Sequence, residues 1–109
     1  MAIQKKLYTV EEFEKFADAW ENTDRRFELI NGEIVEKVPT EKHGTIAGNI
    51  FGFVWNFNRE HQLGNVAIEV RHRMLGDKHN ARMPDVSFIS DPNRTIVERG
   101  SVPQMPIWQ

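Results

Sequence analysis

The stretch "RRFELINGEIVEKV", residues 25–38, decides how the first half of the chain folds. Asn31-Gly32 stands between two apolar runs and is the pair most typical of a two-residue type I′ turn. A turn of this length fixes the register of a hairpin, so the facing residues can be read directly from the sequence. The expected cross-strand pairs are Ile30–Glu33, Leu29–Ile34, Glu28–Val35 and Phe27–Glu36.

This register places Glu28 on the same sheet face as Ile30, Glu33 and Val35. A carboxylate on a partly apolar face lies either at the rim of the sheet or against a partner that holds it there. The hairpin alone leaves both interpretations open.

Two helices are predicted on either side of the hairpin. Thr9 and Glu12 form a T-x-x-E capping box at the start of residues 8–20, whose apolar positions are Val10, Phe13, Ala17 and Trp20. Residues 39–62 form the longest predicted helix, with His43 in its first turn. Gly44, Gly48 and Gly52 recur along one line of this helix, and they suggest close approach of another backbone.

Two further strands complete the predicted order of elements. "LGNVAIEVRHRML", residues 63–75, is expected to form a strand after a Gly64-Asn65 turn, and residues 76–82 a polar loop. "PDVSFIS", residues 84–90, follows as the next strand. The order helix, hairpin, helix, strand, strand is typical of an α+β domain with a mixed or antiparallel sheet. We expect one domain over residues 1–109, ending in a proline-punctuated tail over residues 100–109.

The composition indicates a soluble, globular protein. The chain has 109 residues, a formal charge of −2, 39% hydrophobic and 28% charged residues, and no cysteine. The absence of cysteine fits a reducing compartment, and no secretory signal or membrane-spanning stretch is visible. We therefore expect a cytoplasmic protein without a membrane partner.

The charge is distributed unevenly along the chain. Residues 71–82 carry Arg71, Arg73, Lys78 and Arg82 against the single acid Asp77. Such a segment is either a solvated loop or a surface that contacts the phosphates of a nucleic acid. The four basic residues are the candidates for DNA binding.

Pro84 and Asp85 open the last strand in "ARMPDVSFIS", residues 81–90. Proline cannot donate to a sheet ladder and suits the start of a strand, whereas a carboxylate adds nothing to a core strand. Metal-dependent cleavage of a phosphodiester needs oxygen ligands, and Mg²⁺ is usually held through one or two carboxylates. Asp85 and Glu28 are the candidate metal ligands.

Three stretches together resemble the bacterial "putative restriction endonuclease" family of the PD-(D/E)XK, or restriction-endonuclease-like, superfamily. They are "RRFELINGEIVEKVP", "KHGTIAGNI" and "ARMPDVSFI", in the family's order and spacing. The resemblance covers essentially the whole chain. It implies an endonuclease lineage dependent on Mg²⁺ or Mn²⁺, with Asp85 as metal-binding aspartate, Glu28 as an acidic residue from the hairpin, and His43 beside the active site.

The sequence also departs from this family pattern. Family members continue after the Pro-Asp strand into a second core strand that carries a glutamate, with a lysine further on. Here the only glutamate after Asp85 is Glu98, beside Arg99, and no lysine follows. We therefore expect an incomplete domain, truncated at its C-terminal end, that binds metal weakly and is impaired or inactive as a nuclease.

Two alternatives to an impaired nuclease stay open. The chain is either a non-catalytic nucleic-acid binder or a structural remnant that oligomerises. An incomplete sheet leaves an open edge, which Trp108 of the tail or a second copy of the chain would cover. A homo-oligomer, in the simplest case a dimer, is therefore expected.

Overall fold

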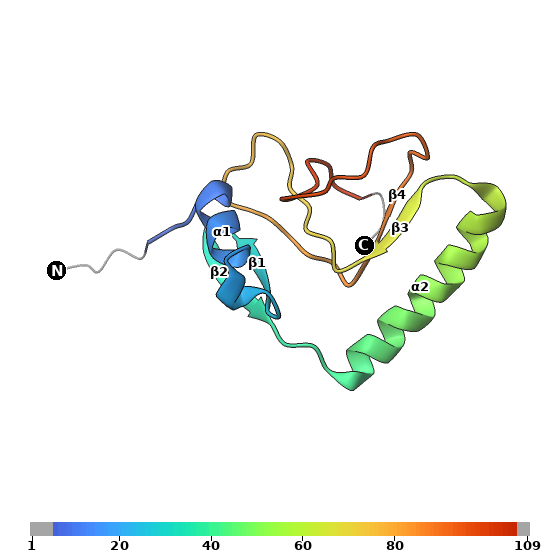
Figure 1. The fold of residues 1–109 in the computed structure, drawn as a ribbon, viewed down its shortest axis with the longest axis horizontal. Coiled ribbons are helices and arrows are strands. Elements are labelled where there is room, and N and C mark those ends of the chain that lie inside the picture. The colour runs from blue at the N-terminus through green and yellow to red at the C-terminus, as the bar shows by residue number, and fades with distance from the viewer. Residues whose placement is uncertain (1–5, 107–109) are drawn as a thin grey trace.

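The computed structural model describes residues 6–106 of the chain (Figure 1). The elements are α1 (Val10–Ala17), a short 3₁₀ helix η1 (Trp20–Asn22), β1 (Arg26–Ile30), β2 (Glu33–Lys37), α2 (Glu41–His61), β3 (Asn65–Ile68) and β4 (Val86–Ile89). This order confirms the predicted α+β class. Trp108, which was considered as a cover for the sheet edge, lies outside the described residues.

The hairpin forms in the predicted register. All four expected pairs are present, and Arg26 and Lys37 add a fifth pair at the open end of the ladder. Asn31 and Gly32 both adopt positive φ angles, 48° and 83°, as a type I′ turn requires. The turn chemistry alone was therefore sufficient to fix which residues share a face.

Helix α1 begins as the capping box predicts. Thr9 Oγ1 accepts a hydrogen bond from the backbone N–H of Glu12, whose carboxylate in turn accepts from the backbone N–H of Thr9. The buried residues of α1 pack with strand β1 and the segment after β3 into one core, made of Val10, Phe13, Ala17, Phe27, Leu29 and Ala81. The expectation for Trp20 was wrong, because α1 ends at Ala17 and Trp20 is 85% exposed in η1.

Strand β3 is shorter than predicted. It ends at Ile68, because Glu69 adopts a φ of 53°, which interrupts the extended backbone. After this break the predicted strand continues only as isolated bridges at His72, which meets Arg82 in antiparallel and Val102 in parallel orientation within the described residues. A third bridge, between Leu29 and Ala81, connects the β1–β2 ladder to the segment that leads into β4.

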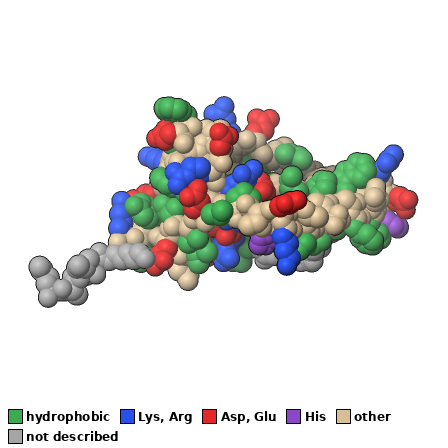
Figure 2. Space-filling model, turned by 90° about the horizontal axis from the view of Figure 1, so that it is seen from below, with side chains coloured by type: hydrophobic (Ala, Val, Ile, Leu, Met, Phe, Trp, Pro, Cys, Tyr) green, Lys and Arg blue, Asp and Glu red, His purple; other side chains and the backbone are tan. Residues whose placement is uncertain are grey.

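Helix α2 runs away from the hairpin, and β3 leads the chain back beside it, so that the ribbon has the outline of an open V (Figure 1). Of its 21 residues none is buried. The expectation that Gly44, Gly48 and Gly52 admit another backbone was wrong within residues 6–106, because a Cβ added at any of them would meet nothing within 4 Å. Figure 2 shows hydrophobic side chains gathered on the surface of this arm.

No helix in the described part of the chain is long and apolar enough to cross a membrane.

Candidate functional site

Asp85 stands directly before strand β4 and lines a cleft between the hairpin and α2. Its side chain is 44% exposed, so the carboxylate is accessible without being free in solvent. One oxygen, Oδ1, lies 3.0 Å from the ammonium of Lys37, and the other, Oδ2, lies 3.8 Å from Nε2 of His43. The carboxylate therefore joins three elements, β2, α2 and the start of β4.

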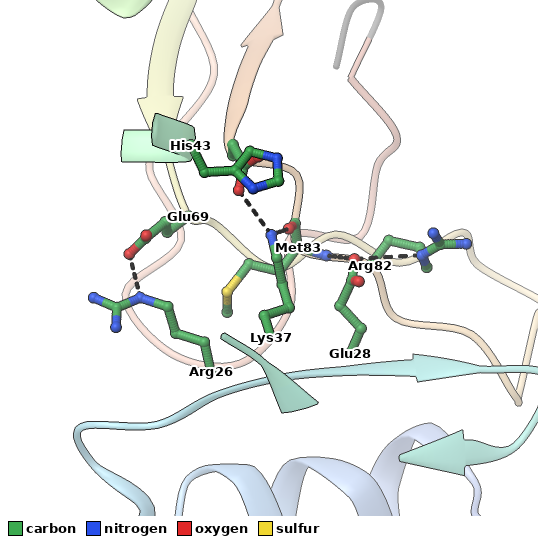
Figure 3. A network of polar contacts seen from close by, with 8 residues as sticks. Arg26, Glu28, Lys37, His43, Glu69, Arg82 and Met83 are labelled. Atoms are coloured by element: carbon green, nitrogen blue, oxygen red, sulfur yellow. Dashed lines mark hydrogen bonds and ion pairs between the residues drawn. The ribbon is translucent and has the colours of Figure 1, made fainter. Parts of the chain in front are cut away.

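Lys37 is the residue of this centre that the sequence analysis missed. It ends strand β2, and its ammonium donates to Asp85 Oδ1 and to the backbone carbonyl of Met83 (Figure 3). The signal was present in the hairpin, because extending the predicted register by one pair places Lys37 opposite Arg26 and on the face of Glu28. Two cations facing each other repel, and each is here bound to a carboxylate, Lys37 to Asp85 and Arg26 to Glu69.

His43 reaches the centre from the first turn of α2. Thr40 caps this helix and accepts a hydrogen bond on its hydroxyl from the backbone N–H of His43, at 3.2 Å. The cap fixes where the helix begins, and so it fixes the direction from which the imidazole approaches Asp85. The predicted pair of Asp85 and His43 does come together in space.

Glu28 lies nearby but its carboxylate is engaged elsewhere. Its Oε2 accepts from the backbone N–H of Met83 at 2.8 Å and from Arg82 Nε at 3.4 Å (Figure 3). Only 15% of the side chain is exposed. Glu28 thus holds the two residues that precede Pro84 and Asp85, which is a reason for a carboxylate on this face of the hairpin.

Two hollows open on either side of the Lys37–Asp85 contact. They have volumes of about 450 and 440 Å³, and Lys37, His43, Ala47 and Asp85 line both. The first also contains Glu28, Ile50, Arg82 and Met83, and the second Arg26, Gly44, Phe51 and Glu69. One wall is therefore an apolar helix surface, and the opposite wall carries charges of both signs.

The donor set restricts which metal centre this cleft can form. Among residues 6–106 no three histidine, cysteine or acidic side chains are placed to hold one ion. Asp85 offers one carboxylate and His43 one imidazole beside it. This pair fits a weakly held Mg²⁺ or Mn²⁺ ion that keeps most of its water, and Mn²⁺ also accepts imidazole.

The four basic candidates for DNA binding divide into two pairs. Arg71 and Arg73 turn toward α1, where Arg71 contacts Asp18 at 3.1 Å and Arg73 contacts Glu11 at 3.4 Å. The Arg71 side chain is only 11% exposed and its guanidinium lies over the ring of Phe13. Lys78 and Arg82 are exposed, and Arg82 also lines the cleft.

His72, between the two engaged arginines, is buried. Its Nε2 lies 3.0 Å from the hydroxyl of Ser87 on β4, and its Nδ1 lies 3.0 Å from the carbonyl oxygen of Gln104. Burial lowers the pKa of His72, against the opposing effect of the carbonyl of Gln104. A neutral imidazole therefore ties the segment around Gln104 to the strand that follows Asp85. The alternation of Val66, Ile68 and Val70 continues to His72, so the sequence did contain a sign of its burial that the sequence analysis did not use.

The α+β architecture places the start of the Pro-Asp strand in a cleft between a hairpin and a long helix. Residues 10–108 match the family model Uma2, described as "Putative restriction endonuclease", and the chain belongs to this family. No curated protein sequence matches the chain.

Proposed function

We propose that this chain is a relative of metal-dependent DNA endonucleases in which Asp85 is the metal ligand. The observation that carries the proposal is the meeting of Lys37, His43 and Asp85 at one cleft, from the end of β2, the start of α2 and the residue before β4. Clustered ionisable side chains that line a hollow are typical of functional sites. Membership of the "Putative restriction endonuclease" family also supports this proposal.

The residues around Asp85 have distinct parts in this proposal. A divalent ion, if bound there, would polarise a phosphate oxygen and lower the pKa of a bound water. Asp85 supplies the anionic oxygen that binds the ion, and His43 places an imidazole, which can bind a metal or carry a proton, beside Oδ2. Glu28 acts as a positioning residue, because it fixes the backbone of Met83 two residues before Asp85.

The proposed activity is weak in the chain as described. Glu28 is bound to Met83 and Arg82, and Glu69 is bound to Arg26, so Asp85 is the carboxylate of this cleft that lies beside His43. A site with one carboxylate binds Mg²⁺ weakly and stabilises less of the charge that develops on a phosphate in the transition state. We therefore propose impaired cleavage rather than efficient turnover.

A plasmid-nicking assay tests this function. Supercoiled DNA is incubated with the full chain and Mn²⁺ or Mg²⁺, and Asp85→Asn is compared with Asp24→Asn, an exposed aspartate before β1. We expect slow nicking that chelator abolishes, that Asp85→Asn lowers by about a hundredfold, and that Asp24→Asn leaves unchanged. If wild-type protein and Asp85→Asn nick DNA at the same rate, Asp85 is not the ligand of a nuclease site.

A second candidate function is nucleic-acid binding without cleavage. The exposure of Lys78 and Arg82 favours it, since exposed cations are accessible to phosphates, and the Arg82 side chain is 47% exposed while its Nε contacts Glu28. Fluorescence anisotropy with labelled duplex DNA over a range of salt concentrations measures the number of phosphates neutralised. Measurable binding without nicking in either metal supports this function, and the absence of binding at low salt removes it.

A further inference from the structure

The contacts of the Lys37 ammonium resemble those of a bound metal ion. Its two acceptors are the carboxylate of Asp85 and the backbone carbonyl of Met83. Carboxylate and carbonyl oxygens are hard donors of the kind that Mg²⁺ and Mn²⁺ take. The side chain is 23% exposed, so the ammonium is more sheltered than the carboxylate to which it is bound.

We propose that Lys37 is a built-in competitor for the cation position at Asp85. A divalent ion that binds Asp85 must displace this ammonium, or share the carboxylate with it at a repulsive distance. The inference rests on the proposed function, because it concerns the same metal ligand. It adds a regulatory element to that site, since the metal affinity then depends on where Lys37 points.

The surroundings of Lys37 allow such a displacement. The ammonium is carried on a flexible four-carbon stem, and Lys37 lines both hollows of the cleft, so each offers space on one side of Asp85. Arg26, its partner across the hairpin, is bound to Glu69 and does not occupy Asp85. Lys37 is therefore the cation whose removal changes the charge at Asp85 most directly.

Mn²⁺ binding to the full chain, followed by the loss of the free-ion electron paramagnetic resonance signal, tests the proposal. Lys37→Met removes the charge and keeps the length of the stem. Lys37→Gln removes the charge and keeps an amide that can donate to Met83. Lys42→Met is the matched control, because it removes one lysine charge from the exposed first turn of α2, next to His43. Circular dichroism and thermal melting show which variants are folded.

We expect both Lys37 variants to bind Mn²⁺ about fivefold more tightly than wild type, and Lys42→Met to bind within about twofold of it. Adding Asp85→Asn to Lys37→Met should abolish the gain. Equal or weaker binding by folded Lys37 variants overturns the competition, and leaves the proposed function standing if wild-type binding still depends on Asp85. No Mn²⁺ binding by any variant overturns both the metal site and the competition.

Discussion

Helices α1 and α2 use their apolar residues in opposite ways. The eight residues of α1 bury Val10, Phe13 and Ala17 against the hairpin, whereas the 21 residues of α2 bury none. Most of the stability of a helix in a protein comes from packing one face rather than from intrinsic propensity. Helix α1 and the hairpin therefore share a packed core with Ala81, while α2 presents an apolar wall to the cleft and to the outside.

The first test of this contrast is a pair of truncations, one in each region. Leu29 is fully buried beside α1, and Phe53 on α2 is 79% exposed. We expect Leu29→Ala to lower the free energy of unfolding by about 2–5 kcal/mol. Phe53→Ala should change it by less than about 0.5 kcal/mol. Guanidinium titrations followed by circular dichroism measure both, and similar losses in the two variants would contradict the contrast.

The predicted homo-oligomer gives the same pair of variants a second use. A copy that covers α2 would make Phe53 part of an interface, so Phe53→Ala would then shift the association equilibrium. Size-exclusion chromatography with light scattering at micromolar concentration measures the mass directly. A stable monomer for wild-type protein would contradict the oligomer prediction and leave α2 exposed.

Two glycines, one inside α2 and one in its connection to β3, differ in how much space surrounds them. A Cβ at Gly64 would lie 1.9 Å from the carbonyl oxygen of Ile89, whereas a Cβ at Gly48 meets nothing within 4 Å. Gly64→Ala should therefore cost about 1–3 kcal/mol of stability, as forced overpacking does. Gly48→Ala should stabilise by up to about 1 kcal/mol, because alanine is the better helix former. Thermal melting measures the stability of both variants. Destabilisation by Gly48→Ala would mean that another backbone does approach α2.

The fold was predictable where local chemistry acts alone. Asn31-Gly32 fixed the hairpin register, and Thr9 with Glu12 fixed the start of α1. The strand break at Glu69 was not predictable, because a positive φ at a glutamate reflects tertiary packing rather than local preference. The open space beside the α2 glycines could not be predicted either. Their spacing shows that another backbone could approach the helix closely, but it does not show that one does.

The site was predictable in part for the same reason. The resemblance of three short motifs identified Asp85 and His43, and these two residues do meet. Lys37 was missed although its place followed from the hairpin register, because it had no counterpart in the motif pattern. The roles of all the predicted site residues remain predictions, and the structure only adds which partners each side chain has. These residues are Glu28, His43, Arg71, Arg73, Lys78, Arg82 and Asp85.

The basic residues provide a test with a smaller effect on stability. Arg71 is bound to Asp18 on α1, and Arg82 borders the cleft. We expect Arg71→Gln to cost about 1 kcal/mol of stability and to leave any DNA affinity unchanged. Arg82→Gln should reduce the slope of log K against log salt by about 1 and leave stability nearly unchanged. Chemical denaturation measures the stability effect, and anisotropy titrations measure the salt slope. A lower salt slope for Arg71→Gln together with a stability loss for Arg82→Gln would show that the two arginines have the opposite roles.

The smallest expected effect is a pH dependence of stability through His72. Burial lowers the pKa of His72 in the folded chain, so the unfolded chain binds the proton first as the pH falls. The stabilising contribution of neutral His72 to the free energy of unfolding is therefore fully present above a pH of about 6.5, the pKa of an unperturbed histidine. It is lost progressively below that pH. Denaturation at several pH values should show the fall in wild type and a flatter curve for His72→Gln. His61→Gln, on the exposed end of α2, should keep the wild-type slope.

The most direct measurement is where a paramagnetic ion binds. Backbone amide signals are assigned by nuclear magnetic resonance, and substoichiometric Mn²⁺ is added to wild-type protein and to Asp85→Asn. We predict that broadening is strongest around Asp85, Lys37 and His43, spanning both the hairpin and α2, and that Asp85→Asn removes it. Broadening centred on another acidic segment, such as the loop at Asp77, or broadening that survives in Asp85→Asn, would show that Asp85 is not the metal ligand.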